Sequence, residues 1–204
     1  MVSIRPTAEP LTEKARTTRA ALVRSACDLF IEQGYGAVSV RDLARRTQVT
    51  SGAIYGHFRN KADLLVAAVN EKLVTDLEAP QRGRSLRLAG YLAAQARNYR
   101  SRAALRALIV EGAAAARVDP DIKEQLRALQ TAKLREWRAI YRELQRSEHL
   151  DPDADMETLV IFLWAAEMGL GVLEALDVPL PKPSAWARVI ESVVRSATEG
   201  STAS

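Results

Sequence analysis

Residues that could bind another molecule occur at three places in the sequence. The segment from Ser39 to Lys61 carries small polar, aromatic and basic residues at spacings that suit contact with a nucleic acid. Glu111 and Glu167 each lie in a strongly apolar stretch. A carboxylate in apolar surroundings is costly unless it is paired, hydrogen-bonded or protonated. Each of these acids could therefore hold a ligand group, reach solvent, or pair with an arginine such as Arg106 or Arg138.

Aromatic and sulfur-containing side chains occur near Glu167. Trp137 and Tyr141 share a face of one predicted helix, and Trp164 and Met168 share a face of the next. Core packing explains such stripes, and so does the lining of a ligand pocket. We predict a cavity for a mostly hydrophobic small molecule. Glu111 and Glu167 would bind a cationic group or a hydrogen-bond donor of that molecule. The candidate ligand-binding residues are Glu111, Trp137, Tyr141, Trp164, Glu167 and Met168.

Stability separates the two interpretations of Glu167. If Glu167 faces the ligand, Glu167→Gln is expected to fold normally and to respond poorly to the effector. If Glu167 is paired, the same change is expected to lower stability, because it leaves the partner unpaired.

Nothing else in the sequence forms a catalytic set. There is no glycine-rich phosphate loop, no nucleophile elbow and no group of paired metal ligands. Cys27 lies on the apolar side of a predicted helix, which indicates a buried, inert thiol, and His149 lies in a predicted loop. We therefore expect no enzymatic activity, no cofactor and no metal site.

Composition and charge indicate a folded protein with a segment suited to binding a polyanion. Of the 204 residues, 48% are hydrophobic and 26% are charged, which disfavours disorder as the main state. Residues 1–62 contain ten Lys and Arg against five Asp and Glu, whereas residues 63–204 contain nineteen against twenty. A basic segment joined to a near-neutral one is typical of a module that binds a polyanion. The apolar stretch 159–173 is short for a membrane span and contains Glu167, so we expect no membrane partner and a cytoplasmic protein.

The periodicity and capping residues predict an all-α protein of about nine helices. Leu22, Ala26, Leu29 and Phe30 form one apolar face of the first. Ser39 and Asp42 form a capping box at the start of the second. The predicted helices cover residues 18–33, 39–47, 50–57, 60–78, 86–100, 102–117, 120–146, 152–175 and 184–198.

The two short helices between residues 39 and 57 describe a helix-turn-helix. Ala44 is small where the helices must cross, and Leu43, Val49 and Ile54 can lock their angle. The second helix opens with Thr50 and three small residues, so it is slim enough for a major groove about 12 Å wide.

This segment resembles the DNA-binding domain of the tetracycline-repressor (TetR) family of bacterial transcription regulators. The resemblance covers residues 22–67, about 45 residues. Gln48 departs from the family pattern, which has Gly in the turn, and could open the turn and change the tilt of the recognition helix. The matching residues are Phe30, Gly34, Tyr35, Ser39, Val40, Arg41, Asp42, Leu43, Ala44, Val49, Thr50, Gly52, Ile54, Tyr55, His57, Phe58, Lys61, Leu64 and Leu65.

The resemblance implies a role for each matching position. Ser51, Gly52 and Ala53 would face bases, Tyr55, His57 and Lys61 would contact phosphates, and Arg41 and Thr50 would flank the DNA backbone. Phe58 and Leu65 would lie in the core of the small domain. Lys14, Arg16 and Arg19 would form either an arm on the DNA or a disordered basic tail.

We therefore expect two domains and a homodimer. Residues 1–62 would bind DNA, with 1–15 as a flexible arm. Residues 63–204 would bind the effector and dimerise, with 200–204 as a frayed tail. The resemblance implies that the last two helices build the dimer interface, and the nearly all-apolar stretch 159–173 independently needs a second cover. The candidate interface residues are Leu163, Leu170, Val189 and Val193.

The implied function is a ligand-responsive repressor that leaves a palindromic operator when a small hydrophobic effector binds. Two alternatives remain at this point. A helical enzyme would reveal itself by turnover of a hydrolase or reductase substrate. A sequence-neutral architectural protein would have no preferred DNA site, and its affinity would depend almost entirely on salt.

Overall fold

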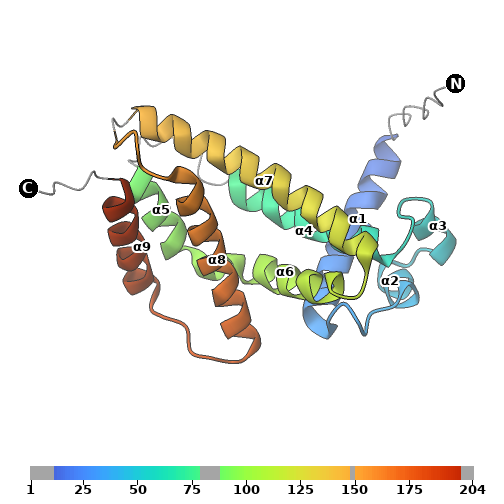
Figure 1. Ribbon diagram of the computed structural model, residues 1–204. Coiled ribbons are helices and arrows are strands. Elements are labelled where there is room, and N and C mark those ends of the chain that lie inside the picture. The colour runs from blue at the N-terminus through green and yellow to red at the C-terminus, as the bar shows by residue number, and fades with distance from the viewer. Residues whose placement is uncertain (1–11, 79–87, 148–149, 199–204) are drawn as a thin grey trace, which may run out of the picture.

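The computed structural model describes residues 12–78, 88–147 and 150–198, and every regular element in these ranges is helical (Figure 1). The predicted all-α fold class is confirmed. These residues form nine α-helices and one 3-10 helix, η1. Their bounds are α1 (Glu13–Gln33), α2 (Val40–Thr47), α3 (Ser51–Tyr55), α4 (Lys61–Glu78), α5 (Leu88–Arg97), η1 (Tyr99–Arg102), α6 (Ala103–Ala116), α7 (Pro120–Ser147), α8 (Met156–Ala175) and α9 (Pro183–Thr198).

Helix α1 is longer than its apolar periodicity predicted. It begins at Glu13 instead of Thr18, because the Thr12 hydroxyl accepts a hydrogen bond from the Ala15 N–H and caps an exposed first turn. Gly34, at φ 80°, ends the helix in a backbone conformation that favours glycine. The predicted apolar face is confirmed by the burial of Leu22, Ala26, Leu29 and Phe30.

Two predicted helix boundaries after α4 are wrong. The predicted helix 86–100 is shorter, since α5 ends at Arg97 and η1 follows it. Helix α8 begins four residues later than predicted. Its N-cap is Asp155, whose carboxylate accepts hydrogen bonds from two N–H groups of the first turn. Asp151 instead accepts the N–H of Asp153 in the preceding turn.

The first hydrophobic core joins the N-terminal helices to the middle of the chain. Buried side chains of α1 to α4 pack with Leu105 and Leu108 of α6 and with Ile122 of α7. In Figure 1, α1, α2 and α3 lie at one end of the molecule, and α4 and α7 run from there toward α5. Residues on both sides of the expected domain boundary at position 62 share this core.

The second hydrophobic core lies at the opposite end, where α5 packs along α9 (Figure 1). Leu88, Ile190 and Val194 are buried there together with apolar residues of α8. Trp137 of α7 packs against both cores. Helix α7 therefore links the two halves of the fold through one large side chain.

Helices α6 and α8 cross closely at Gly171. A Cβ atom at position 171 would lie 2.9 Å from the Cβ atom of Arg106, so one helix would have to move to accommodate a larger residue. The sequence predicted that Gly169 and Gly171 permit close helix approach. Gly171 does so within the chain, whereas nothing lies within 4 Å of a Cβ at Gly169.

Helix α8 leaves an apolar surface uncovered. Among the described residues it is the single helix long and apolar enough to cross a membrane by length and composition, and 28% of that stretch is buried. Its exposed apolar side chains are Ile161, Phe162, Val172 and Leu173. A contiguous apolar surface of this kind marks a site that another molecule covers.

Candidate DNA-binding surface and effector cavity

Helices α2 and α3 have the geometry of the predicted helix-turn-helix. The Asp42 N–H donates to the Ser39 hydroxyl (3.2 Å) and the Ser39 N–H donates to the Asp42 carboxylate (2.9 Å), which confirms the capping box. Gln48 is left-handed (φ 56°, ψ 30°), which costs a non-glycine residue about 1–2 kcal/mol. The turn is nevertheless closed, because the Val49 N–H donates to the Ala44 carbonyl (3.2 Å).

Helix α3 exposes a slim face opposite a buried anchor. Ile54 is buried in the first core. The hydroxyl of exposed Thr50 caps the helix by accepting the Ala53 N–H at 3.1 Å. Gly52 and Ala53 are exposed and Ser51 is half-buried. A bare face held rigidly from behind suits insertion into a major groove.

The residues expected at phosphates differ in accessibility. Tyr55 is 56% exposed and Arg41 is exposed, so both are free to meet a DNA backbone. His57 is half-buried, with its ring centroid 6.5 Å from that of Phe58. The buried positions of Phe58 and Leu65 agree with the core roles implied for them. The DNA contacts themselves stay predictions.

Lys61 corrects one of the phosphate assignments. Its ammonium donates hydrogen bonds to the carbonyls of Tyr35 and Val38, each at 2.8 Å, and lies 4.2 Å from the Tyr35 ring centroid. Burial lowers the pKa of this ammonium. Lys61 therefore closes the loop between α1 and α2. Sequence reasoning missed this role because the partners are main-chain carbonyls far away in the sequence.

We accordingly expect Lys61→Met to lower stability rather than to act mainly through DNA. Two carbonyls lose a charged donor, and a hydrogen bond to a charged group contributes about 1.5–3 kcal/mol. Urea unfolding should show a loss in that range, while the matched change Lys14→Met on exposed α1 should change stability little. An unchanged unfolding curve for Lys61→Met together with weakened DNA binding would restore the phosphate assignment.

The predicted N-terminal arm is helical where the structure describes it. Lys14, Arg16 and Arg19 lie in the first turns of α1, so they do not form a disordered tail, and their contact with DNA stays a prediction. The Arg19 guanidinium stacks on the Phe58 ring, 4.9 Å from its centroid. The rest of the expected arm, the tail 200–204 and His149 lie outside the described residues.

Cys27 occupies the buried position expected of an inert thiol. Its Sγ lies 3.7 Å from the Ala68 carbonyl oxygen in the first core. Burial raises the pKa of the thiol to about 11. Cys27 is therefore protonated at neutral pH and is a poor nucleophile.

A cavity of about 130 Å³ lies between the two cores. All three tryptophans of the chain line it, namely Trp137, Trp164 and Trp186, and the rings of the first two are 4.9 Å apart at 51°. Tyr91 and Tyr141 add two more aromatic walls. The predicted cavity is thus present, and Trp137, Tyr141, Trp164 and Glu167 line it as expected. Sequence reasoning missed Trp186, because α9 had been assigned to the dimer interface, and it did not single out Tyr91 on α5.

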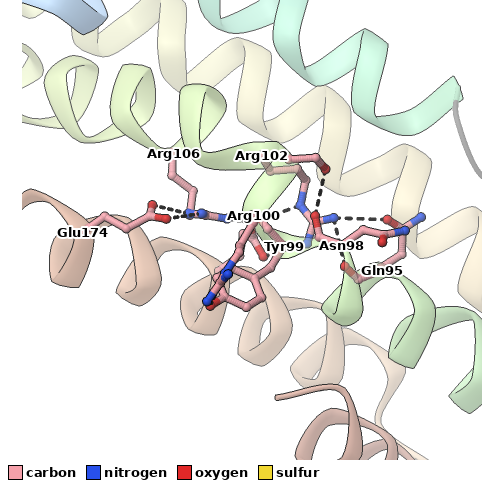
Figure 2. Close-up of polar contacts among 9 residues, drawn as sticks. Gln95, Asn98, Tyr99, Arg100, Arg102, Arg106 and Glu174 are labelled. Carbon is pink, nitrogen blue, oxygen red and sulfur yellow. Dashed lines mark hydrogen bonds and ion pairs between the residues drawn. The ribbon is translucent and has the colours of Figure 1, made fainter. Parts of the chain in front are cut away.

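Glu167 is paired with two arginines. Its carboxylate accepts hydrogen bonds from Arg102 Nε and Nη2, each at 3.0 Å, and from Arg106 Nη1 at 2.7 Å. Arg106 is fully buried and donates two further bonds to Glu174, at 2.7 and 2.5 Å. Figure 2 shows Arg106 extending from α6 to Glu174, and Arg102 extending to Gln95. Because its charge is satisfied inside the protein, Glu167 is not available to a cationic effector, and we now expect Glu167→Gln to lose stability.

Two other candidate ligand residues do not line the cavity. Glu111 points the other way along α6, where its carboxylate accepts the Tyr35 N–H at 2.7 Å. Glu111 therefore anchors the loop after α1, and its carboxylate gives no support for a ligand contact. Met168 is half-buried on α8 outside the cavity lining. Arg138, an alternative partner for either acid, pairs with Glu157 instead.

The candidate interface residues divide into two groups. Leu170 is buried within the chain, which does not favour its assignment to a dimer interface, and Leu163 is half-buried and lines the cavity. The interface itself stays a prediction. Val189 is 54% exposed on α9 and Val193 is half-buried beside it. On α8, the exposed apolar face carries Phe162 rather than Leu163 or Leu170.

A family model supports the interpretation of the N-terminal segment. Residues 22–68 match the model described as bacterial regulatory proteins, tetR family. A relative, the HTH-type transcriptional repressor Rv3405c of Mycobacterium tuberculosis, is 47% identical over 58 residues, which are 28% of this chain and 30% of that protein. The matched segment thus spans about a third of the length of the curated relatives.

Solved structures extend the likeness of fold to nearly the whole chain. A putative TetR-family transcriptional regulator from Rhodococcus sp. superimposes with a TM-score of 0.76 at 17% identity, over 90% of this chain and all of that one. FadR from Bacillus subtilis, solved in complex with stearoyl-CoA, gives 0.69 at 17% identity over 87% and 98%. The N-terminal segment is thus similar to the DNA-binding domain of the tetR family of bacterial regulatory proteins, and the rest of the chain shares the fold of solved structures at low sequence identity.

Proposed function

We propose that the protein is a ligand-responsive, sequence-specific transcriptional regulator that acts as a cytoplasmic repressor. The observation that carries this proposal is the combination, in one chain, of a helix-turn-helix with a bare α3 face and an aromatic cavity remote from it. The relative named a repressor and the neighbour solved with stearoyl-CoA support the two halves of the proposal. A two-state coupling of about 1–3 kcal/mol would change operator affinity roughly 5- to 150-fold.

The repressor acts as a homodimer on a near-palindromic operator in this proposal. A two-fold dimer places two recognition helices on successive turns of one DNA face. The exposed apolar side chains of α8 and Val189 of α9 supply the surface. Covering this surface with a second copy removes from water the apolar area that the monomer leaves exposed.

Selection of bound sequences from random duplex DNA tests the DNA-binding function. We expect a near-palindromic consensus, and we expect Ala53→Asn to change the preferred bases without loss of stability, because Ala53 is exposed on α3. The matched exchange Ala139→Asn on distant α7 should leave the consensus unchanged.

Three outcomes would count against this function. Enrichment of no consensus, with affinity that follows salt alone, would identify a sequence-neutral architectural protein. An identical consensus for wild type and Ala53→Asn would show that α3 does not read bases. Turnover of a hydrolase or reductase substrate would favour the helical enzyme.

A further inference from the structure

The cavity has an aromatic body and a single polar end. Trp137, Trp164 and Trp186 form the body together with aliphatic side chains of α5, α7 and α8. The polar lining residues are Tyr91, Gln95, Arg102, Tyr141 and Glu167. A volume of about 130 Å³ is close to that of an engineered apolar cavity of about 150 Å³ that binds benzene. One aromatic ring fits this space.

The charged groups at the polar end are already paired with each other. Arg102 directs Nε and Nη2 at Glu167, and Nη1 at the main-chain and side-chain oxygens of Gln95 (3.1 and 3.2 Å). Both carboxylate oxygens of Glu167 accept bonds from arginine. A carboxylate ligand would find no open guanidinium fork, and an ammonium ligand would find no free carboxylate. Either would bring an unpaired charge into a desolvated site.

The Tyr91 hydroxyl is hydrogen-bonded to the Gln95 side chain, which leaves the Tyr141 hydroxyl as the available polar group at this end. Tyr141 is buried and lines the cavity, and its hydroxyl has no hydrogen-bond partner among the residues that the structure describes. Burial raises the pKa of this phenol, so it stays protonated and able to donate. The hydroxyl oxygen is not among the fully buried unpaired atoms of the described residues, so it is accessible from the cavity, where a ligand or water can complete its hydrogen bonding.

We propose that the effector is an uncharged, one-ring aromatic molecule with a single hydrogen-bonding group. The ring occupies the space between the tryptophans, and its polar group meets the hydroxyl of Tyr141. This inference rests on the proposed function only in treating the bound molecule as an effector. The ligand class follows from the cavity, where self-paired charges exclude ions and leave one neutral hydroxyl.

Three probes of one ring and different charge test the ligand class on the full-length protein. Benzyl alcohol, benzoate and benzyltrimethylammonium are titrated, and binding is followed by tryptophan fluorescence and by the unfolding temperature. We expect benzyl alcohol to bind at least about tenfold more tightly than either ion, a difference of about 1.4 kcal/mol. Equal or tighter binding of an ion, or no binding of any probe at millimolar concentration, would overturn the proposal.

A hydroxyl deletion tests the contact. Tyr141→Phe should weaken benzyl alcohol binding about fivefold to tenfold and leave toluene binding unchanged, because only the alcohol uses the hydroxyl. Tyr99→Phe is the matched control. It deletes a hydroxyl that donates to the Pro181 carbonyl at 2.7 Å outside the cavity, and should leave both affinities unchanged. If Tyr141→Phe weakens the binding of benzyl alcohol and of toluene equally, the hydroxyl acts only through packing and the proposed hydrogen bond is wrong.

The experiments distinguish an error in the proposed ligand class from an error in the proposed function. Benzyl alcohol that binds but does not change affinity for the selected DNA would contradict ligand-responsive regulation and leave the ligand class intact. Release of that DNA by an ion, with the ion bound more tightly than benzyl alcohol, would overturn the ligand class and leave regulation intact.

Discussion

Arg106→Met is expected to lower the free energy of unfolding by about 3–5 kcal/mol, because removal of one partner from a buried ion pair leaves the other charge uncompensated. Arg106 is fully buried and pairs with both Glu167 and Glu174. Its loss leaves Glu174 without this partner and leaves Glu167 with Arg102 alone. Against a typical total of about 5–15 kcal/mol, this loss is large. Urea denaturation followed by circular dichroism measures it.

The surface offers a matched control for Arg106→Met. Arg127→Met removes an exposed pair with Glu124 and should cost about 0.2–1 kcal/mol. Adding Glu174→Gln to Arg106→Met should recover part of the loss, since it removes one stranded charge. Similar costs for Arg106→Met and Arg127→Met would mean that the cluster contributes no more than a surface pair.

Phe162→Arg is expected to convert the protein from a dimer to a monomer. Phe162 is 46% exposed on the apolar face of α8, and in a two-fold dimer each substitution acts twice. Loss of about 2 kcal/mol of apolar burial per copy weakens association about a thousandfold, before the cost of burying the new charge. Light scattering should change from twice the chain mass of 22.4 kDa to that mass.

An exposed valine elsewhere controls for the added charge. Val118→Arg, at a position that is 87% exposed between α6 and α7, should remain dimeric. The Phe162→Arg monomer should also bind the selected operator weakly, because each half-site then binds independently. A wild-type mass of 22.4 kDa at micromolar concentration, or a dimeric Phe162→Arg, would place the interface elsewhere or remove it.

Features encoded by neighbouring residues were predictable from the sequence. The capping box of Ser39 and Asp42 depends on contacts within a few residues, and it is present. The buried face of α1 followed from its periodicity. The tryptophan-lined cavity was predictable in part, because Trp137 and Trp164 lie on helices that had to pack together.

The errors concern features that only the tertiary arrangement decides. Helix α8 is apolar nearly all round, so its sequence could not show that Leu163 and Leu170 face inward while Phe162 faces outward. The pairing of Glu167 depends on Arg102 of η1 and Arg106 of α6, about sixty residues away, and Gly171 lets α8 approach α6 closely. Arg106 was named as a possible partner, but nothing in the sequence distinguished it or Arg102 from the other arginines of the chain.

The membership of Trp137 in both hydrophobic cores has a consequence for cooperativity. Each core is a candidate unit of local unfolding, and units of this kind open with different free energies. A molecule bound against Trp137 sits at the seam between the two units, so opening either one disrupts part of its site. A bound ligand therefore raises the free energy of local unfolding of both cores. The ligand-bound protein should unfold more cooperatively than the ligand-free protein.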